Sequence, residues 1–186
     1  MRIFVIEPDG GGGLMHYSYQ MCDALTRSGE DVTLITSQHF ELDHLPHTFR
    51  IEQRLRLWNA VGQSLPDSKL GSLLVRMMRK VRRVGRGVRF VVVWHRLTNY
   101  LIDQGPDIVQ FSAIHFSFQR IFLRRLRRAG LTVTQICHEF EPREKSKLTR
   151  TLSQIGHQKV FEAFDLIYLH GAGNRDRFHE VYDIPR

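Results

Sequence analysis

Residues 2–36, "RIFVIEPDGGGGLMHYSYQMCDALTRSGEDVTLIT", predict a strand, a glycine-rich turn, a helix and a second strand. Arg2 to Glu7 contains the apolar run Ile3–Ile6 and is typical of a buried strand, and four glycines follow at residues 10–13. Apolar residues then recur at helical spacing from Leu14 until Gly29, which is a typical helix stop. Asp31 to Thr36 is β-branched and apolar, as strands are. This order predicts a β-α-β unit.

Strands and helices alternate along the rest of the chain. A third strand is predicted in "HTFRIEQRL" at residues 47–55, and further strands at Ile108–Phe111, Thr132–Cys137 and Asp165–Leu169. Strands buried on both faces belong to a parallel sheet with helices on each side, so we predict a Rossmann-like α/β fold in one domain, residues 1–186. Helices are predicted at Lys69–Val84, Val91–Asp103, Phe118–Ala129, within Leu148–Ala163, and at Asn174–Val181, with Gly85 and Gly87 breaking the first from the second.

The composition is that of a soluble globular protein. Hydrophobic residues make up 42% of the 186 residues and charged residues 25%. The two cysteines, Cys22 and Cys137, cannot build a disulfide framework. The first apolar run is too short for a signal peptide, and the run Phe90–Trp94 is far below the ~20 residues of a membrane span. We therefore expect a cytoplasmic chain.

The net charge of +8 predicts an anionic partner: nucleic acid, a phospholipid surface or a phosphorylated ligand. Nucleic acid is the least favoured of the three, because aromatic residues are not interleaved with the basic clusters and no RNA- or DNA-binding motif is present. His39, His44 and His47 share a loop, but without a thiol or a matching ligand pair a solvated loop is preferred, and no metal site is expected.

The glycine turn does not fit two common nucleotide motifs. In a dinucleotide fingerprint that starts at Gly10 and Gly12, Met15 stands where the third glycine belongs, and no acid ends the second strand. The Gly-Lys-Ser/Thr end of a P-loop is absent. What remains is a glycine loop at a helix N-terminus, whose free N–H groups favour a phosphate or another oxygen-rich ligand. A tight turn without a ligand is the alternative.

Four segments in order resemble the N-terminal domain of the retaining GT-B glycosyltransferases of family 4. They are "GGGLMHYSYQMCDALTRSGEDVTLITS", "GPDIVQFSAIH", "LTVTQICHEFEPRE" and "FDLIYLHGAGNRDRFHEVYDIPR". Each motif is weak alone, but the ordered set covers nearly the whole chain. The resemblance implies that the Rossmann-like sheet is one half of a GT-B fold.

The resemblance also implies roles for particular residues. Gly11, Gly12 and Gly13 would form the turn near the donor diphosphate and the acceptor. His16 would make a supporting or acceptor contact, together with Glu139, which replaces the usual aspartate. His138 would lie near the donor sugar as the catalytic residue, and it also follows a strand on the ligand-binding edge of the sheet. A loop histidine bonded to backbone is the alternative for His138.

The largest departure from the family is an absence. The second domain of these enzymes, which binds the nucleotide-sugar, is marked by two glutamates that flank seven residues, and no pair in this sequence has that spacing. The resemblance therefore implies an acceptor-side half that needs a separate or following C-terminal donor domain. It implies no tightly bound cofactor, and a nucleotide-diphosphate sugar as donor substrate.

The helix at Lys69–Val84 has an apolar stripe opposite a basic face. Such a face suits anionic headgroups at the inner face of the plasma membrane, and a helix packed by its apolar stripe with a solvated basic face is the alternative. The basic residues are Arg76, Arg79, Lys80, Arg82 and Arg83.

Two functions follow. The first is half of a glycosyltransferase of polysaccharide biosynthesis, which transfers a sugar to a glycan or a lipid-linked acceptor. The alternative is a non-catalytic basic module that docks on anionic membranes or on a partner subunit.

Overall fold

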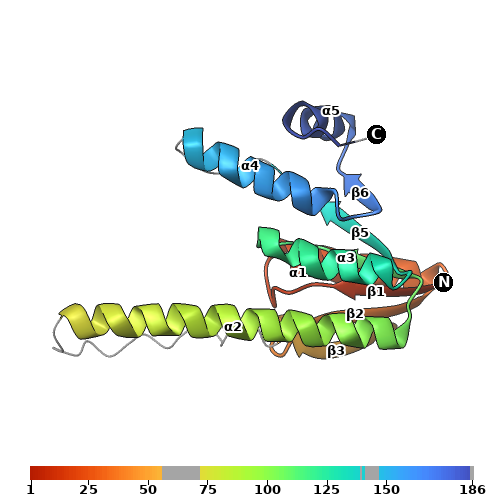
Figure 1. Cartoon of the computed structure of the whole chain (residues 1–186). Coiled ribbons are helices and arrows are strands. Elements are labelled where there is room, and N and C mark those ends of the chain that lie inside the picture. Colours follow the sequence, from red (N-terminus) through yellow and green to blue (C-terminus); the bar gives the residue numbers. More distant parts are fainter. Residues whose placement is uncertain (56–71, 139, 141–146, 185–186) are drawn as a thin grey trace.

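The computed structural model describes residues 1–55, 72–138, 140 and 147–184, without the side chains of residues 72–84 and 147–153. Six strands form one sheet in the order β3-β2-β1-β4-β5-β6, and every neighbouring pair is parallel (Figure 1). The predicted parallel Rossmann-like sheet is therefore confirmed. The strands are β1 Arg2–Ile6, β2 Asp31–Ser37, β3 Arg50–Leu55, β4 Ile108–Phe111, β5 Thr132–Cys137 and β6 Leu166–Leu169.

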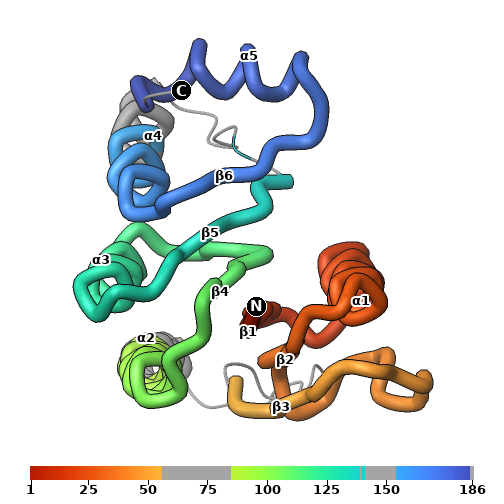
Figure 2. The backbone as a smooth tube through the Cα atoms, turned by 90° about the vertical axis from the view of Figure 1, so that its right-hand side faces the viewer, coloured from red at the N-terminus to blue at the C-terminus, as the bar shows by residue number. Residues whose placement is uncertain are grey.

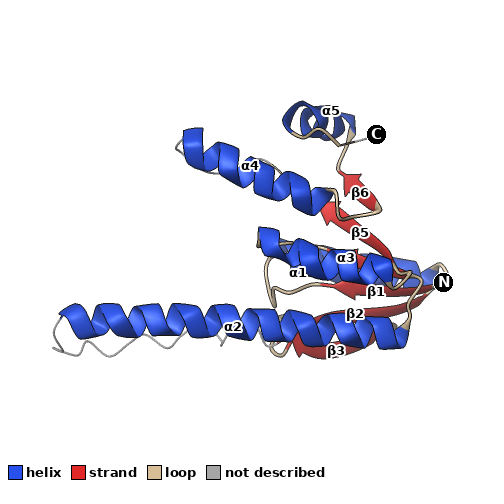
Figure 3. Cartoon of the chain, in the orientation of Figure 1, coloured by secondary structure: helices blue, strands red, loops and turns tan. Residues whose placement is uncertain are grey.

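Helices cover both faces of the sheet, as predicted. Helix α1 lies on one face, and α2, α3 and α4 lie on the other (Figure 2). A short 3-10 turn at Ser117–Gln119 leads into α3. The helices are α1 Gly13–Arg27, α2 Ser72–Gln104, α3 Arg120–Arg128, α4 Lys147–Phe161 and α5 Ala172–Val181 (Figure 3).

The alternation of side chains along β1 divides the core into two halves. Ile3 and Val5 pack with Met15 and Cys22 of α1. Phe4 and Ile6 point the other way and pack in the cluster built by α2 and α3, which includes Trp94, Leu97, Leu101, Phe122, Leu123 and Leu126. Because the strand buries both faces, its sequence is continuously apolar rather than alternating.

One expected break in the chain is wrong. Gly85 and Gly87 do not divide two helices, because α2 runs without interruption from Ser72 to Gln104. A Cβ at either glycine would meet no atom within 4 Å among the residues that the structure describes, and neither glycine has a positive φ. A glycine inside a helix costs roughly 1 kcal/mol relative to alanine, which a helix anchored by buried Phe90 and Trp94 can tolerate.

The first half of α2 extends beyond the edge of the sheet at which the strands end (Figure 1). That half carries the predicted basic face at Arg76, Arg79, Lys80, Arg82 and Arg83, whose side chains lie outside the described part of the chain. Among the helices that the structure describes, none combines the length and the hydropathy required to cross a bilayer.

Candidate functional site

The strand order reverses between β1 and β4, and the candidate site lies at the carboxyl ends of the strands around this point. In parallel sheets of this kind, ligands bind at this edge. Described residues of five connections lie there: the glycine turn after β1, the loop after β2 that carries Glu41, and Ser112, His138 and His170, which directly follow β4, β5 and β6. We call these segments, together with the start of α1, the carboxyl-edge site.

The glycine turn is crowded at Gly10 and open at Gly12 and Gly13. A Cβ at Gly10 would lie 2.3 Å from the carbonyl oxygen of His39. The loop after β2 therefore packs against the turn and leaves no room for a side chain at Gly10. Gly12 precedes α1 with φ at 82°, a left-handed conformation that favours glycine. No atom of the described residues lies within 4 Å of a Cβ at Gly12 or Gly13, so this side of the turn is open toward that part of the chain.

A carboxylate of the chain lies at the start of α1. The Gly12 amide donates a hydrogen bond to Glu41 Oε1 at 2.8 Å, and His16 Nε2 lies 2.9 Å from the same oxygen. The Glu41 amide in turn donates to the carbonyl oxygen of Gly10 at 2.8 Å. The N–H groups at a helix N-terminus attract anions. Glu41 therefore fills part of the place that the sequence predicts for an oxygen-rich ligand.

Glu7 lies beneath the turn and is fully buried. It follows β1, and its carboxylate accepts hydrogen bonds from the Asp9 amide at 2.9 Å and from Ser18 Oγ at 3.3 Å. Burial raises the pKa of Glu7, and hydrogen bonding from Ser112 opposes that shift. Nearby, His115 Nε2 lies 3.4 Å from Asp9 Oδ2, which joins the loop after β4 to the glycine turn.

His138 forms a pair with a second histidine. His138 Nδ1 lies 3.1 Å from His170 Nε2, and the two ring centroids are 4.6 Å apart. The ring of Tyr17 on α1 meets both imidazoles edge-on, at 4.8 Å from His138 and 5.5 Å from His170. Burial, and after it the neighbouring His170, lower the pKa of His138. His138 is thus held by three elements at the carboxyl-edge site.

Helix α1 connects the predicted residues. In its first two turns, His16 contacts Glu41, and the adjacent Tyr17 contacts the ring of His138. Residue Glu139 lies outside the described part of the chain. Within residues 1–55, 72–138, 140 and 147–184, no group of three or more His, Cys, Asp or Glu side chains is arranged to hold a metal ion. The expected roles of the glycines, His16 and His138 stay predictions.

Sequence reasoning missed Glu41, Glu7, Tyr17 and His170 as parts of this site. A signal for His170 existed in the sequence, because it directly follows a predicted strand as His138 does; the register, in which Cys137 and Leu169 are partners, then makes the two histidines neighbours. Ile6 and Phe111 are partners in the same way, which places Glu7 beside Ser112. Glu41 carries no such signal, because the path of its loop decides where its carboxylate lies.

The sequence matches no protein-family model and no curated protein. Its structure is similar to that of HepE from Anabaena, solved in complex with UDP, with a TM-score of 0.57 and 10% identity over 97% of this chain. It is also similar to MurG from Acinetobacter baumannii, with a TM-score of 0.54 and 11% identity over 94% of this chain. The chain spans 41% and 43% of the length of these two structures. At this identity the likeness concerns the fold, and the chain has the Rossmann-like α/β architecture of one half of a GT-B protein.

Proposed function

We propose that the chain is the N-terminal, acceptor-side half of a retaining glycosyltransferase. The whole enzyme would transfer a sugar from a nucleotide-sugar to a glycan or a lipid-linked acceptor, in polysaccharide biosynthesis at the cytoplasmic side of the membrane. The single observation that carries this proposal is the combination of fold and edge: a sheet like that of the GT-B proteins presents an open glycine turn and His138 where ligands of such sheets bind.

The described geometry supports a division of roles. Gly12 and Gly13 form the N-terminal, positive end of α1, and with Gly11 before them their amides would receive the donor diphosphate in place of Glu41. His16 would assist there, once its contact with Glu41 is exchanged for one with the ligand. His138, exposed at the same edge of the sheet and in contact with Tyr17 of α1, would contact the transferring sugar through a hydrogen bond. No bound cofactor is invoked, because the donor is a substrate.

The other wall of the site would come from a donor-binding domain. The structural neighbours are more than twice as long as this chain, which covers 41% and 43% of them. The family resemblance assigns nucleotide-sugar binding to that other half. This chain by itself is therefore proposed to transfer no sugar.

The test begins with the coding DNA around this chain. We expect it to encode, in the same or an adjacent frame, a second domain with two glutamates that flank seven residues. The two halves together should transfer sugar from one of a panel of radiolabelled nucleotide-sugars, and His138→Ala should reduce the rate at least tenfold while His44→Ala, in an exposed loop, leaves it unchanged. Absence of such a domain, or an unchanged rate in His138→Ala, would contradict the proposal.

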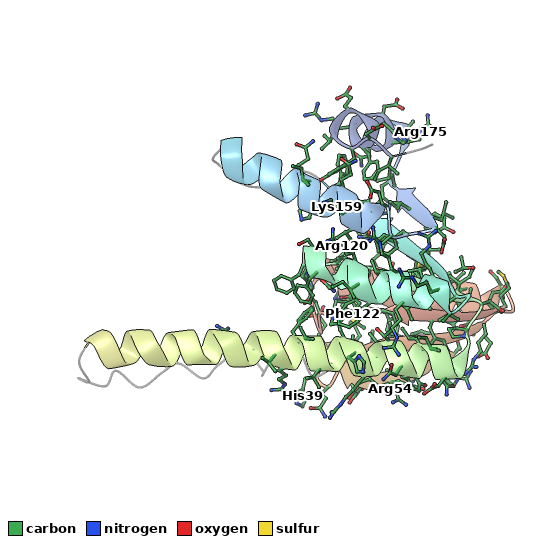
Figure 4. All side chains as sticks on the ribbon, in the orientation of Figure 1. His39, Arg54, Arg120, Phe122, Lys159 and Arg175 are labelled. Atoms are coloured by element: carbon green, nitrogen blue, oxygen red, sulfur yellow. The ribbon has the colours of Figure 1, made fainter. Side chains whose placement is uncertain are left out.

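A second candidate function, docking on anionic membranes, rests on the exposed face of α2 and α3. Both helices carry exposed apolar and basic side chains: Val88, Val91, Val92 and Arg96 on α2, and Ile121, Arg124, Arg125 and Arg128 on α3. The two helices are joined, since Arg125 Nη1 lies 3.5 Å from His95 Nδ1, and Phe122 (Figure 4) packs on Trp94 with ring centroids 6.0 Å apart. Arginines attract anionic headgroups, and exposed valine and isoleucine can enter the interface.

Flotation with vesicles tests this candidate. The chain should float with vesicles rich in phosphatidylserine and not with phosphatidylcholine alone, and changing Arg124, Arg125 and Arg128 to Glu should abolish flotation. The matched control changes Arg27, Arg50 and Arg175 to Glu, because these exposed arginines lie on α1, β3 and α5 and the net charge falls equally. Equal loss in both variants would mean that net charge, and not this face, binds the vesicles.

A further inference from the structure

A hollow beside α1 is an apolar feature of the molecule that the proposed function leaves unused. It holds about 490 Å³ and extends along α1 from Met1 and Ile3 to Tyr17 and His170. Its walls are mostly apolar, and they include Met21 and Leu25 of α1, Ile108 of β4, Ile136 of β5 and Tyr168 of β6. We call this hollow the α1 groove.

The strand register shows which face of the sheet forms the groove. Val5, Gln110 and Thr134 are successive register partners in β1, β4 and β5, so their side chains share the face on which Val5 packs with α1. Leu166 and Tyr168 of β6 continue this face, and they are 49% and 47% exposed. Of the helices α1 to α4, only α1 lies on it (Figure 2). The sheet therefore presents uncovered apolar side chains next to α1.

The polar group in the floor of the groove is already paired within the chain. Gln110 is buried, its Oε1 accepts a hydrogen bond from Thr134 Oγ1 at 2.7 Å, and its Nε2 donates to the carbonyl oxygen of Phe111 at 3.3 Å. Among the described residues that line the groove there is no Asp, Glu, Lys or Arg, although such residues make up 25% of the chain. A ligand is thus held here by burial of apolar surface, which favours an alkyl chain over an anionic headgroup.

One end of the groove opens at the carboxyl-edge site. Tyr17 and His170 line this end, and the Tyr17 ring meets the imidazoles of His138 and His170 edge-on at 4.8 and 5.5 Å. One molecule can therefore place an apolar chain in the groove and a polar group beside His138. An amphiphile has these two parts, whereas a purely apolar partner would leave the polar end of the groove unused.

We propose that the α1 groove binds the alkyl chain of an amphiphile whose polar head lies at the carboxyl-edge site. Met1 and Met21 suit such a ligand, because methionine side chains adapt to apolar groups of different shapes. The inference rests on the proposed function for the statement that this amphiphile is the sugar acceptor, and it then narrows the acceptor to a lipid-linked one. Binding of the alkyl chain itself does not depend on sugar transfer.

The test is a titration, followed by nuclear magnetic resonance, of the chain labelled with ¹³C in its methionine methyl groups. The ligands are hexyl, heptyl and octyl glucoside below their critical micelle concentrations, with glucose alone as the control. We expect saturable shifts of the Met1 and Met21 signals and none of Met15, which is fully buried on the same helix. Each added CH₂ should tighten binding about fourfold, the equivalent of ~0.8 kcal/mol per buried CH₂. Equal affinity for the three glucosides, shifts that do not saturate, or the same shifts with glucose would overturn the inference.

Tyr168 offers matched variants, because it is half exposed and can be replaced without opening the core. Tyr168→Glu places a carboxylate in the wall of the groove and should weaken octyl glucoside binding by about tenfold or more. Tyr168→Leu keeps the wall apolar and should bind as the wild type does. Ile155→Glu, on α4 and 48% exposed, makes the same change in charge outside the groove and should have no effect. Equal weakening in Tyr168→Glu and Ile155→Glu would mean that the glucoside does not bind in the groove.

Other occupants of the groove would give different results. A dimer in sedimentation that Tyr168→Glu prevents would mean that a second copy covers the groove, and it would overturn the inference. Loss of the methionine shifts once the two proposed halves are assembled would overturn it as well, because the donor domain would then cover the groove. If the chain binds the glucosides while the assembled halves transfer no sugar, the groove stands and the proposed function fails.

Discussion

Gly12 is the residue whose backbone conformation shapes the glycine turn. Its φ is 82°, and within the described part of the chain no atom lies within 4 Å of where a Cβ would be. With ψ at −176° the backbone of Gly12 lies in a region that is nearly restricted to glycine, so Gly12→Ala should cost backbone strain alone, about 1–3 kcal/mol of unfolding free energy. Gly13→Ala is the matched control, since that position is equally open and lacks a positive φ, and its stability should be unchanged or higher. Urea denaturation compares them, and equal stability of the two variants would contradict this account of the turn.

Glu7 makes the stability of the fold depend on pH. Burial raises its pKa, so the folded state holds a proton that the unfolded state releases, and unfolding free energy falls as the pH rises from the ordinary carboxyl pKa through the raised one. Glu7→Gln keeps an acceptor for Asp9 and can donate to Ser18. It should be about 1 kcal/mol more stable than the wild type at pH 8 and lose that advantage at pH 4. A constant difference across this range would contradict the prediction.

Glu41 competes with an added anion for the start of α1. Glu41→Gln keeps an acceptor for the Gly12 amide but removes the charge, so calorimetry should show pyrophosphate binding severalfold tighter than in the wild type. Glu162→Gln removes an exposed charge that lies after α4 and serves as the control. Unchanged affinity in Glu41→Gln, or equal gains in both variants, would show that the carboxylate does not occupy the binding place.

The residues of the site that could be predicted are those marked by a pattern in adjacent residues of the sequence. Four adjacent glycines and a histidine directly after a strand are visible in the sequence, and the structure places both at the carboxyl-edge site. Glu41 was not predictable, because it lies 29 residues after Gly12 in the sequence. It follows β2 in a loop without a regular pattern, and only the path of that loop brings its carboxylate to the Gly12 amide. His170 needed the strand register, which the sequence does not reveal.

At the scale of elements, α2 tests how glycine acts within a helix. Gly85 and Gly87 both lie inside it with free space around them, so changing both to Ala should raise helical ellipticity. The unfolding free energy should rise by up to about 1 kcal/mol per substitution. Circular dichroism with thermal denaturation measures both quantities. Lower ellipticity in the double variant would indicate that the glycines are needed at a bend, as the sequence first suggested.

The other elements were predicted well because their apolar patterns agree with their burial. Five of the six strands are short apolar or β-branched runs, and all six form where they were predicted; the third, at residues 50–55, is the exception in composition, since it alternates arginine, glutamate and glutamine with two aliphatic residues. The break in α2 was the error, since a local rule about glycine ignored the anchoring by Phe90, Trp94, Leu97 and Leu101. Helix propensity is a weak preference that tertiary packing often overrides.

At the scale of the whole molecule, the strand order assembles the site. The reversal between β1 and β4 places the glycine turn beside the loop at Ser112, and β5 and β6 add the histidine pair. No single motif in the sequence predicts that these segments lie together. The central claim is that this edge is one wall of a diphosphate-binding cleft, and that the remaining wall belongs to a donor domain.

Titration of the isotope-labelled chain with UDP and with pyrophosphate tests this claim most directly. We predict saturable changes in the amide signals of Gly11, Gly12 and Gly13 and in the rings of His16 and His138. The hollow between Arg124 and Asp165, at the opposite edge of the sheet, should show none. The account would be contradicted if the signals did not saturate at about 10 mM ligand, which means a binding free energy weaker than ~3 kcal/mol. It would also be contradicted if the changes were confined to that opposite edge.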